Sequence, residues 1–350
     1  MTSTKRQALG FIAVLAVVCP FAVGCNRILG IKEHGLADGG GGAGGGGGTG
    51  GSAGAGILAC SDPGVNGAVD AAVGTACGFT MPNPVGSGLP HAASYTVNPQ
   101  DDSVIDNVTG LIWERNVDPG DYRQSDADNY CRGKGGDWRL PTRIELVSLL
   151  DFTVSNPNPV PPPDPTTVHP MISPMFSNAP AERFWSSSKK PGDPNTGWAV
   201  GFDVGNTRQK QVTDTYRVRC VRRPPSQCSP TGYQVNEQEG TVYDVATGLT
   251  WQRAIADRQD WDSASTYCSA QFGSAWRLPS LTELQTIVDE TQQDPSIDRE
   301  AFPCTPISDF FWTAAQYVGD TAWAYYVTFI HGHSDIQAIG TRSFVRCVKP

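Results

Sequence analysis

The sequence predicts an α+β fold in which one module is present twice. Three observations lead to this prediction: an internal repeat, an even number of cysteines in the repeated part, and helix signals that precede strand signals in each copy. The chain has 350 residues, a length typical of two or three domains. Ten cysteines and nine tryptophans argue against disorder and against an ordinary cytosolic enzyme. The net charge of −9 argues against a general nucleic-acid binder.

Residues 1–25 have the features of a bacterial lipoprotein signal peptide. Lys5 and Arg6 precede an apolar run, which ends in the small residues before Cys25. We expect Cys25 to be the lipid attachment site and the first mature residue, so that acyl chains hold the protein to a membrane. The expected location is the outer membrane or cell surface, with a periplasm-facing orientation as an alternative. An ordinary secretory signal or a retained signal anchor also remains open.

Residues 26–59 are predicted to be a flexible tether. Glycine occupies 13 of the 18 positions from 39 to 56, without the proline-containing period of collagen. A glycine-rich coil of this length has a root-mean-square reach of about 30 Å. A lead-in segment, residues 60–103, follows the tether.

The internal repeat defines two copies, residues 104–223 (copy 1) and 224–350 (copy 2). Val104–Arg115 and Val242–Arg253 share the pattern Thr-Gly-Leu-x-Trp-x-Arg. Further blocks recur in the same order: Tyr130-Cys131 with Tyr267-Cys268, Trp138-Arg139-Leu140-Pro141 with Trp276-Arg277-Leu278-Pro279, Phe184-Trp185 with Phe311-Trp312, Trp198-Ala199 with Trp323-Ala324, and Arg219-Cys220-Val221 with Arg346-Cys347-Val348. Chance does not produce such an ordered set.

Each copy contains signals for turns, helices and strands in the same order. The Thr109-Gly110 pair predicts a turn between two extended runs. Thr142 and Glu145, like Ser280 and Glu283, form capping-box patterns just after a proline, so each begins a helix. A shorter helix is expected around each Tyr-Cys pair, and short strands in the second half. We therefore expect two helices and a small, mostly antiparallel sheet in each copy.

Eight cysteines remain once Cys19 is cleaved off and Cys25 is acylated, an even number in an exported chain. Cysteines that occupy equivalent positions in the two copies are expected to form equivalent disulfides, and the others then pair among themselves. The predicted disulfides are Cys131–Cys220, Cys268–Cys347, Cys60–Cys77 and Cys228–Cys304. Metal ligation by cysteine is disfavoured because the sequence has no Cys-x-x-Cys pair.

Taken together, the repeated motifs resemble the C-terminal domain of Legionella collagen-like adhesins. The resemblance covers both copies and implies a C-type-lectin-like α+β fold and surface binding, with anionic glycans such as sulfated glycosaminoglycans as ligands. The chain has a glycine tether where those adhesins have a collagen-like stalk, so trimer formation is not implied. It also lacks the Glu-Pro-Asn and Trp-Asn-Asp signatures of calcium-dependent sugar binding.

A basic segment in copy 1 is the candidate anion-binding site. Residues 181–223 contain nine basic and four acidic residues, whereas copy 2 contains seven and 15. The candidate ligand-binding residues are Lys189, Lys190, Arg208, Lys210, Arg217 and Arg219. Strand alternation would place Arg217 and Arg219 on one face. A solvated face, or contact with the acidic second copy, is the alternative.

No catalytic residue, metal site or cofactor is predicted. Ser186–Lys189 contains a Ser-x-x-Lys pattern, but copy 2 does not repeat it and the partner motifs are absent. His331, His333 and Asp335 have no counterpart in copy 1, so a polar loop is favoured over a metal site. Arg139 and Arg277 are expected to make structural hydrogen bonds, and the shared tryptophans are expected in the core.

We therefore expect a surface lipoprotein with two binding modules, an adhesin or glycan-binding protein and not an enzyme. The alternative is a structural or envelope-assembly protein whose modules bind protein partners or each other. The sequence leaves open the ligand's identity, calcium binding and the oligomeric state.

Overall fold

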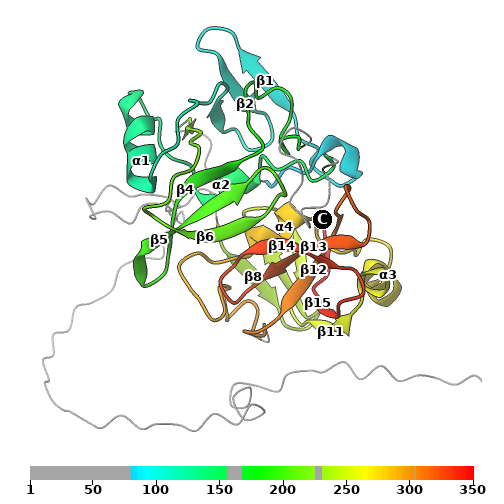
Figure 1. The fold of residues 1–350 in the computed structure, drawn as a ribbon. Coiled ribbons are helices and arrows are strands. Elements are labelled where there is room, and N and C mark those ends of the chain that lie inside the picture. Colours follow the sequence, from blue (N-terminus) through cyan, green and yellow to red (C-terminus); the bar gives the residue numbers. More distant parts are fainter. Residues whose placement is uncertain (1–79, 155, 157–167, 225–230, 304) are drawn as a thin grey trace, which may run out of the picture. The chain divides into compact units, whose positions relative to one another are not determined.

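The computed structural model describes residues 80–154, 156, 168–224, 231–303 and 305–350 (Figure 1). The copy 1 part consists of a short 3₁₀ helix η2 (Val85–Ser87), β1 (Tyr95–Asn98), β2 (Ser103–Asp106), β3 (Ile112–Glu114), α1 (Gln124–Gly133), α2 (Arg143–Val147), β4 (Arg183–Lys190), β5 (Asp193–Gly201), β6 (Thr207–Gln211) and β7 (Val221–Arg222). The copy 2 part consists of β8 (Tyr233–Asn236), β9 (Thr241–Asp244), β10 (Thr250–Gln252), β11 (Ala256–Gln259), α3 (Trp261–Phe272), α4 (Leu281–Thr286), β12 (Phe310–Gln316), β13 (Trp323–Thr328), β14 (Ser334–Ala338), β15 (Ser343–Val345) and β16 (Val348–Lys349).

Each copy has a small antiparallel sheet, ordered β1-β2-β3-β7 in copy 1 and β8-β9-β10-β16 in copy 2. β1 lies within the segment 60–103, so that segment supplies the first strand of the copy 1 sheet. The Thr-Gly turn joins the second and third strands of each sheet. Its glycine has a positive φ, 72° at Gly110 and 74° at Gly248, a conformation that a residue with a Cβ adopts only with strain. This requirement explains the repeated glycine.

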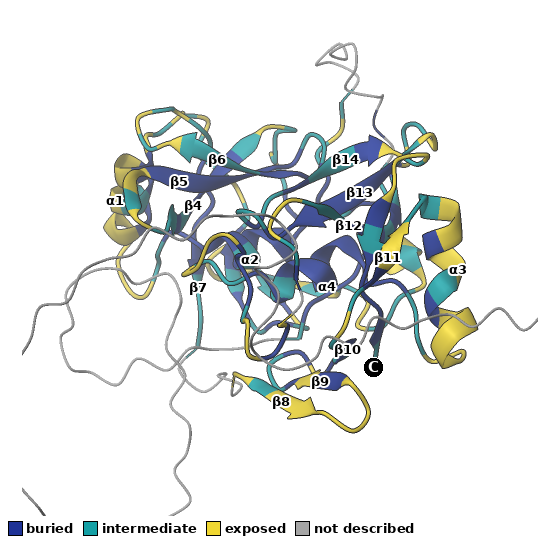
Figure 2. Ribbon diagram, turned by 90° about the horizontal axis from the view of Figure 1, so that it is seen from below, coloured by how far each residue is buried: buried dark blue, intermediate teal, exposed yellow. Residues whose placement is uncertain are grey.

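The large sheet has eight strands in the order β11-β15-β12-β13-β14-β6-β5-β4, and it runs through both copies (Figure 2). Its strands are antiparallel except for the parallel pair β12 and β15. Copy 1 contributes three strands and copy 2 five. The two copies join where β6 pairs with β14, at Thr207 and Ser334. The repeat predicts one sheet in each copy, whereas the structure has a small sheet in each copy and one large sheet that both copies share.

The helices begin where the capping-box patterns predict. The hydroxyl of Thr142 accepts a hydrogen bond from the backbone N–H of Glu145, and the Glu145 carboxylate accepts one from the N–H of Thr142. Ser280 and Glu283 repeat this arrangement at α4. α2 and α4 lie side by side beneath the large sheet, whereas α1 and α3 lie near its two ends (Figure 2).

Two of the predicted disulfides are present. Cys131 in α1 is bonded to Cys220, and Cys268 in α3 is bonded to Cys347, with Cα–Cα distances of 5.4 and 5.6 Å. Each disulfide links the first helix of its copy to the residue that directly precedes the last strand. The proposed pairs Cys60–Cys77 and Cys228–Cys304 lie outside the described residues, as does Cys25.

Most of the shared tryptophans are buried in the core, as the sequence predicts, whereas Trp138, Trp276 and Trp323 are partly buried and pack against its edge. Trp113 and Trp251 are fully buried at equivalent positions, and Trp185 and Trp312 likewise. One hydrophobic cluster crosses the boundary between the copies, because Phe152 and Met171 of copy 1 pack with the core of copy 2. Within the described part of the chain, every helix falls short of the length and hydrophobicity that crossing a membrane requires.

Candidate functional site

Two lysines of the basic segment flank a glycine on the large sheet. Lys189 on β4 and Lys210 on β6 both pair with Gly197 on β5, one from each side. Directly opposed residues of antiparallel strands point to the same face, so the two ammonium groups share one face of the sheet. Their Cα atoms are two strand spacings apart, about 10 Å. Gly197 between them is buried, and the side chain of Gln124 lies over it, so the two cations stand on either side of a covered backbone.

Gln124, the first residue of α1, fixes Lys189. Its side-chain N–H₂ donates to the carbonyl oxygens of Ser186 and Ser188, and its carbonyl oxygen accepts from Lys189 Nζ. A Cβ on Gly197 would collide with this Gln124 amide, which explains the glycine at this position. Partial burial lowers the pKa of Lys189, with Asp128 opposing that effect. In the described residues neither Lys190 nor Lys210 is in ion-pair contact with a carboxylate, although Lys190 stands opposite Asp193 in the β4–β5 pairing, and Lys210 Nζ lies 6.0 Å from the centre of the Tyr216 ring.

Four arginines of the basic segment form ion pairs with carboxylates of the fold. Arg208 forms an ion pair with Asp335 of copy 2, which is the contact with the acidic copy that the sequence left open. Arg217 contacts Glu182 at 2.5 Å and Asp121 at 3.5 Å. Arg222 forms an ion pair with Asp101, and Arg223 forms one with Glu145.

The assignment of Arg219 to the ligand site is wrong. Its side chain is fully buried, with the guanidinium carbon 4.9 Å from the Phe176 ring centre and 5.7 Å from that of Phe184. Nη1 donates to the backbone carbonyl oxygens of Glu114 and Arg115 at 2.5 and 3.1 Å. Burial lowers the pKa of Arg219 to about 10, with Glu114 opposing. Arg346 has the same role in copy 2, donating to the carbonyls of Gln252 and Arg253. The repeated arginine is therefore a structural residue.

Arg139 and Arg277 make the structural hydrogen bonds predicted for them. Arg139 contacts both carboxylate oxygens of Glu145, at 2.8 and 2.6 Å, and Arg277 contacts both of Glu283, at 2.7 and 2.8 Å. Burial on its own would raise the pKa of Glu145, but the charge and hydrogen bonds of Arg139 outweigh it and lower the pKa to about 2.

The serines of the Ser-x-x-Lys pattern are held by the fold. Ser186 is fully buried and its hydroxyl donates to the carbonyl of Trp198 at 2.7 Å. Ser188 Oγ accepts from the backbone N–H of Arg143 at 2.9 Å. Lys189 contacts Gln124, as described above. These contacts give both serines a structural explanation.

His331 and His333 come just before Ser334 in the sequence. Ser334 lies at the seam, where β6 of copy 1 pairs with β14 of copy 2. Burial, then Arg208 and His331, lower the pKa of His333 to about 4. His331 Nδ1 is 3.8 Å from Asp294 Oδ1. Asp335 is occupied by Arg208 and by Asn206 Nδ2. In the described residues no group of three or more His, Cys, Asp or Glu is placed to hold a metal ion.

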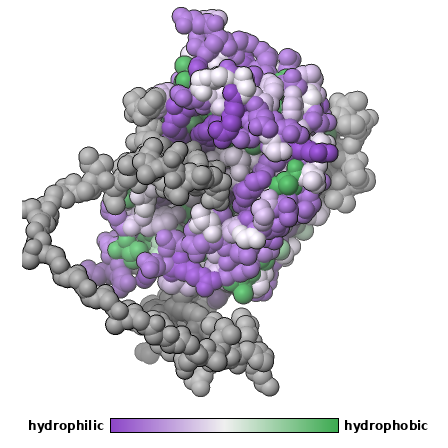
Figure 3. Space-filling model, turned by 90° about the vertical axis from the view of Figure 1, so that its left-hand side faces the viewer, coloured by the Kyte–Doolittle hydropathy of each residue, from purple (hydrophilic) through white to green (hydrophobic). Residues whose placement is uncertain are grey.

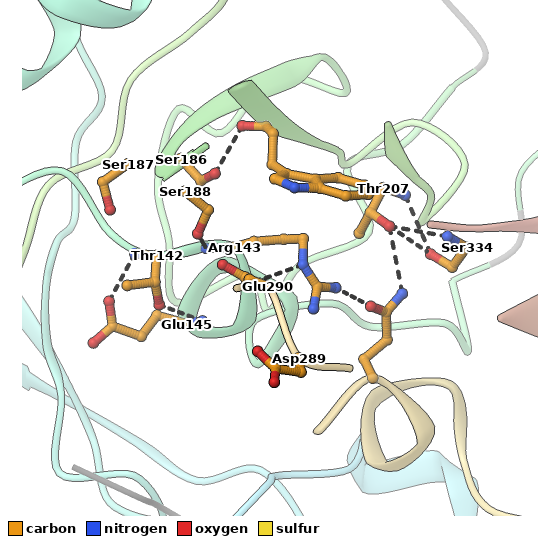
Figure 4. Close-up of polar contacts among 12 residues, drawn as sticks. Thr142, Arg143, Glu145, Ser186, Ser187, Ser188, Thr207, Asp289, Glu290 and Ser334 are labelled. Atoms are coloured by element: carbon orange, nitrogen blue, oxygen red, sulfur yellow. Dashed lines mark hydrogen bonds and ion pairs between the residues drawn. The ribbon is translucent and has the colours of Figure 1, made fainter. Parts of the chain in front are cut away.

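A polar cluster that sequence reasoning missed lies between α2 and α4 (Figure 4). Arg143 on α2 is fully buried, and its Nε contacts Glu290 Oε1 of copy 2 at 2.7 Å. Its Nη1 donates to the Gln285 side chain on α4, which in turn donates to Thr207 Oγ1 at 3.5 Å. The guanidinium lies 5.4 Å from the Trp198 ring centre. The cluster joins both helices to the β6–β14 pairing.

One signal in the sequence could have revealed this cluster. Arg143 aligns with Leu281, Gln285 with Val147, and Glu290 with Phe152. Each pair has a polar residue in one copy and an apolar residue in the other. Polar residues at positions that the other copy leaves apolar indicate contacts made by one copy only.

The side of the molecule on which α1 lies is largely hydrophilic, with scattered hydrophobic side chains (Figure 3). The geometry defines a pair of equivalent α+β units, each with one disulfide, that share a continuous sheet. The Lcl C-terminal domain family model matches residues 102–222 and again 240–349, so the chain belongs to that family and contains its domain twice. The comparison with curated proteins finds no relative.

Proposed function

We propose that this chain is an exported lipoprotein of the bacterial surface whose paired Lcl domains bind anionic glycans, as an adhesin does. The observation that carries the proposal is the row Lys189–Gly197–Lys210. It places two cations on one sheet face, with Lys190 next in sequence. Lysine ammonium groups bind sulfate and carboxylate as point charges. A glycan with sulfates at regular spacing would meet both cations at once.

The surroundings support a polar ligand. The face shown in Figure 3 is largely hydrophilic, which suits a glycan better than an apolar partner. Gln124 holds Lys189 in place, so less side-chain entropy is lost on binding. Arg208, Arg217 and Arg219 are excluded from the contact set because carboxylates or backbone carbonyls already occupy them.

We also propose that each copy has a C-type-lectin-like fold. Two features support this: the helices precede the strands of the large sheet, apart from β11 in copy 2, and a disulfide joins the first helix of each copy to its carboxyl-terminal part. The lipid on Cys25 and the glycine tether would present both copies away from the membrane. Replacement of Cys25 by alanine should abolish metabolic labelling with palmitate and release the protein from the membrane fraction.

The binding test is retention on immobilised heparin, with a neutral dextran resin as the comparison. The wild-type protein should bind heparin at about 50 mM NaCl and elute as salt screens the charges. The variant Lys189→Gln/Lys210→Gln should elute early. Arg258→Gln/Lys349→Gln removes two charges from copy 2 and should elute like wild type.

Equal early elution of both double variants would show a net-charge effect and contradict the site. A protein that ignores heparin but purifies as a stable homo-oligomer would favour the alternative, an envelope-assembly protein whose modules bind protein partners.

A further inference from the structure

The seam between the copies is built from equivalent surfaces. β6 of copy 1 pairs with β14 of copy 2, and α2 packs beside α4. The central contact is reciprocal: Thr207 N donates to Ser334 Oγ at 3.2 Å, and Ser334 N donates to Thr207 Oγ1 at 2.9 Å. This is the geometry of an isologous dimer interface, in which the same patch is used by both partners. Backbone pairing alone would therefore allow copy 1 to join another copy 1.

The two ends of the seam differ in chemistry. At one end, Arg143 of copy 1 contacts Gln285 and Glu290 of copy 2. At the other end the aligned residues are apolar, and Leu281 and Phe152 belong to the same buried hydrophobic cluster. The polar residues of copy 1 at the seam therefore face polar residues of copy 2, and the apolar residues of one copy face apolar residues of the other.

Pairing of like copies would break this match at both ends. Two copies of copy 1 would place each buried Arg143 opposite Val147 and Phe152, with no carboxylate. Two copies of copy 2 would place Gln285 and Glu290 opposite Leu281. A buried charge without its partner is strongly unfavourable. Complexes that would leave such a charge unpaired are therefore disfavoured relative to the correct pairing.

We infer that Arg143, Gln285 and Glu290 are specificity-determining residues for pairing between the copies. The seam face of copy 1 is a binding surface whose partner is an Lcl domain of the copy 2 type, with a glutamine and a glutamate on the facing segment. The chain consequently closes on itself and does not join other chains through this face. This inference does not depend on glycan binding.

The experiment uses the full chain with a protease site inserted after Pro224, which keeps Cys228 for its predicted disulfide with Cys304, and the chain is cleaved after purification under non-reducing conditions. Native mass spectrometry should show a complex of one copy 1 with one copy 2, and no dimer of like copies. Arg143→Leu should weaken that complex at least about 100-fold in a dilution series, because Glu290 loses its cation in a buried setting. It should also allow dimers of copy 1, since leucine fits opposite Val147 and Phe152.

Two further variants separate specificity from general damage. Glu290→Gln keeps the side-chain shape and should weaken the complex at least about 10-fold without unfolding either copy. Arg217→Leu, the same substitution at an ion pair away from the seam, should leave dissociation unchanged. Dimers of like copies in the cleaved wild-type protein, or Arg143→Leu and Glu290→Gln complexes within threefold of wild type, would overturn the inference.

Discussion

The ion pair of Arg139 with the buried Glu145 makes a strong prediction about stability. Glu145→Gln keeps the shape of the side chain and removes its charge, as protonation would. The carboxylate lies within 2.8 Å of two guanidinium nitrogens and accepts from the N–H of Thr142. Loss of the charge leaves Arg139 beside a neutral amide at the start of α2.

The magnitude follows from the pKa of Glu145, which falls from an ordinary 4.5 to about 2 on folding. The lowered value means that the folded state favours the carboxylate. The stabilisation is present above the unfolded value and is lost as pH falls towards 2. The difference corresponds to about 3 kcal/mol in the free energy of unfolding at neutral pH.

Urea unfolding of both proteins at several pH values between 2 and 6 measures this directly. At pH 6 the wild-type protein should be more stable than Glu145→Gln by about 3 kcal/mol, and the gap should close towards pH 2. Glu182→Gln breaks the more exposed pair with Arg217 and should cost less than about 1 kcal/mol. A gap that stays constant with pH would refute the assignment of this stabilisation to the Glu145 carboxylate.

Three further predictions concern the fold. Replacement of Cys131 and Cys220 by alanine opens a cross-link over 89 residues and should lower the free energy of unfolding by about 4–5 kcal/mol in urea; a loss below about 1 kcal/mol would contradict the role of this disulfide. Gly248→Ala should lower the melting temperature because φ is 74° there, whereas Gly133→Ala, at the end of α1 with open space around its Cβ, should not; equal effects would contradict the turn argument. Arg219→Met should destabilise copy 1 by about 2 kcal/mol or more, because two backbone carbonyls lose their donor, and a neutral effect in thermal unfolding would contradict the structural role.

The elements within each copy could be predicted because their causes are local or are repeated in the sequence. A capping box requires only four consecutive residues, and Thr142 and Ser280 begin their helices where that pattern stands. The disulfide pairings followed from the equivalence of the copies. Cys131 and Cys268 occupy one position of the module, and Cys220 and Cys347 occupy another. Repetition removed the ambiguity that cysteine counting leaves.

The joined sheet could not be predicted in this way. Each copy specifies its own strands, but the pairing of β6 with β14 depends on two surfaces more than 100 residues apart that fit each other. Thr207 and Ser334 look like ordinary polar strand residues, and their burial results from the pairing itself. Arg143 lies inside the capping-box pattern of α2, and that pattern carries no information about the other copy.

The basic segment shows a different limit. Counting charges identified an excess in residues 181–223, but the charge that a ligand meets depends on which side chains are already paired. Arg217 and Arg208 find carboxylates, one of them across the seam, and Arg219 is buried between aromatic rings. The cations that remain for a ligand are Lys190, Lys210 and Lys189, the last of them also hydrogen-bonded to Gln124.

Hydrogen–deuterium exchange across the seam tests the central claim, that two Lcl domains form one folded unit through a continuous sheet. Peptides covering residues 205–211 and 332–338 contain the amides of Thr207 and Ser334, which the pairing buries. They should exchange as slowly as peptides from the interior strands β5 and β13. Rapid exchange in both peptides, with β5 and β13 still protected, would show that the copies fold separately and contradict the account.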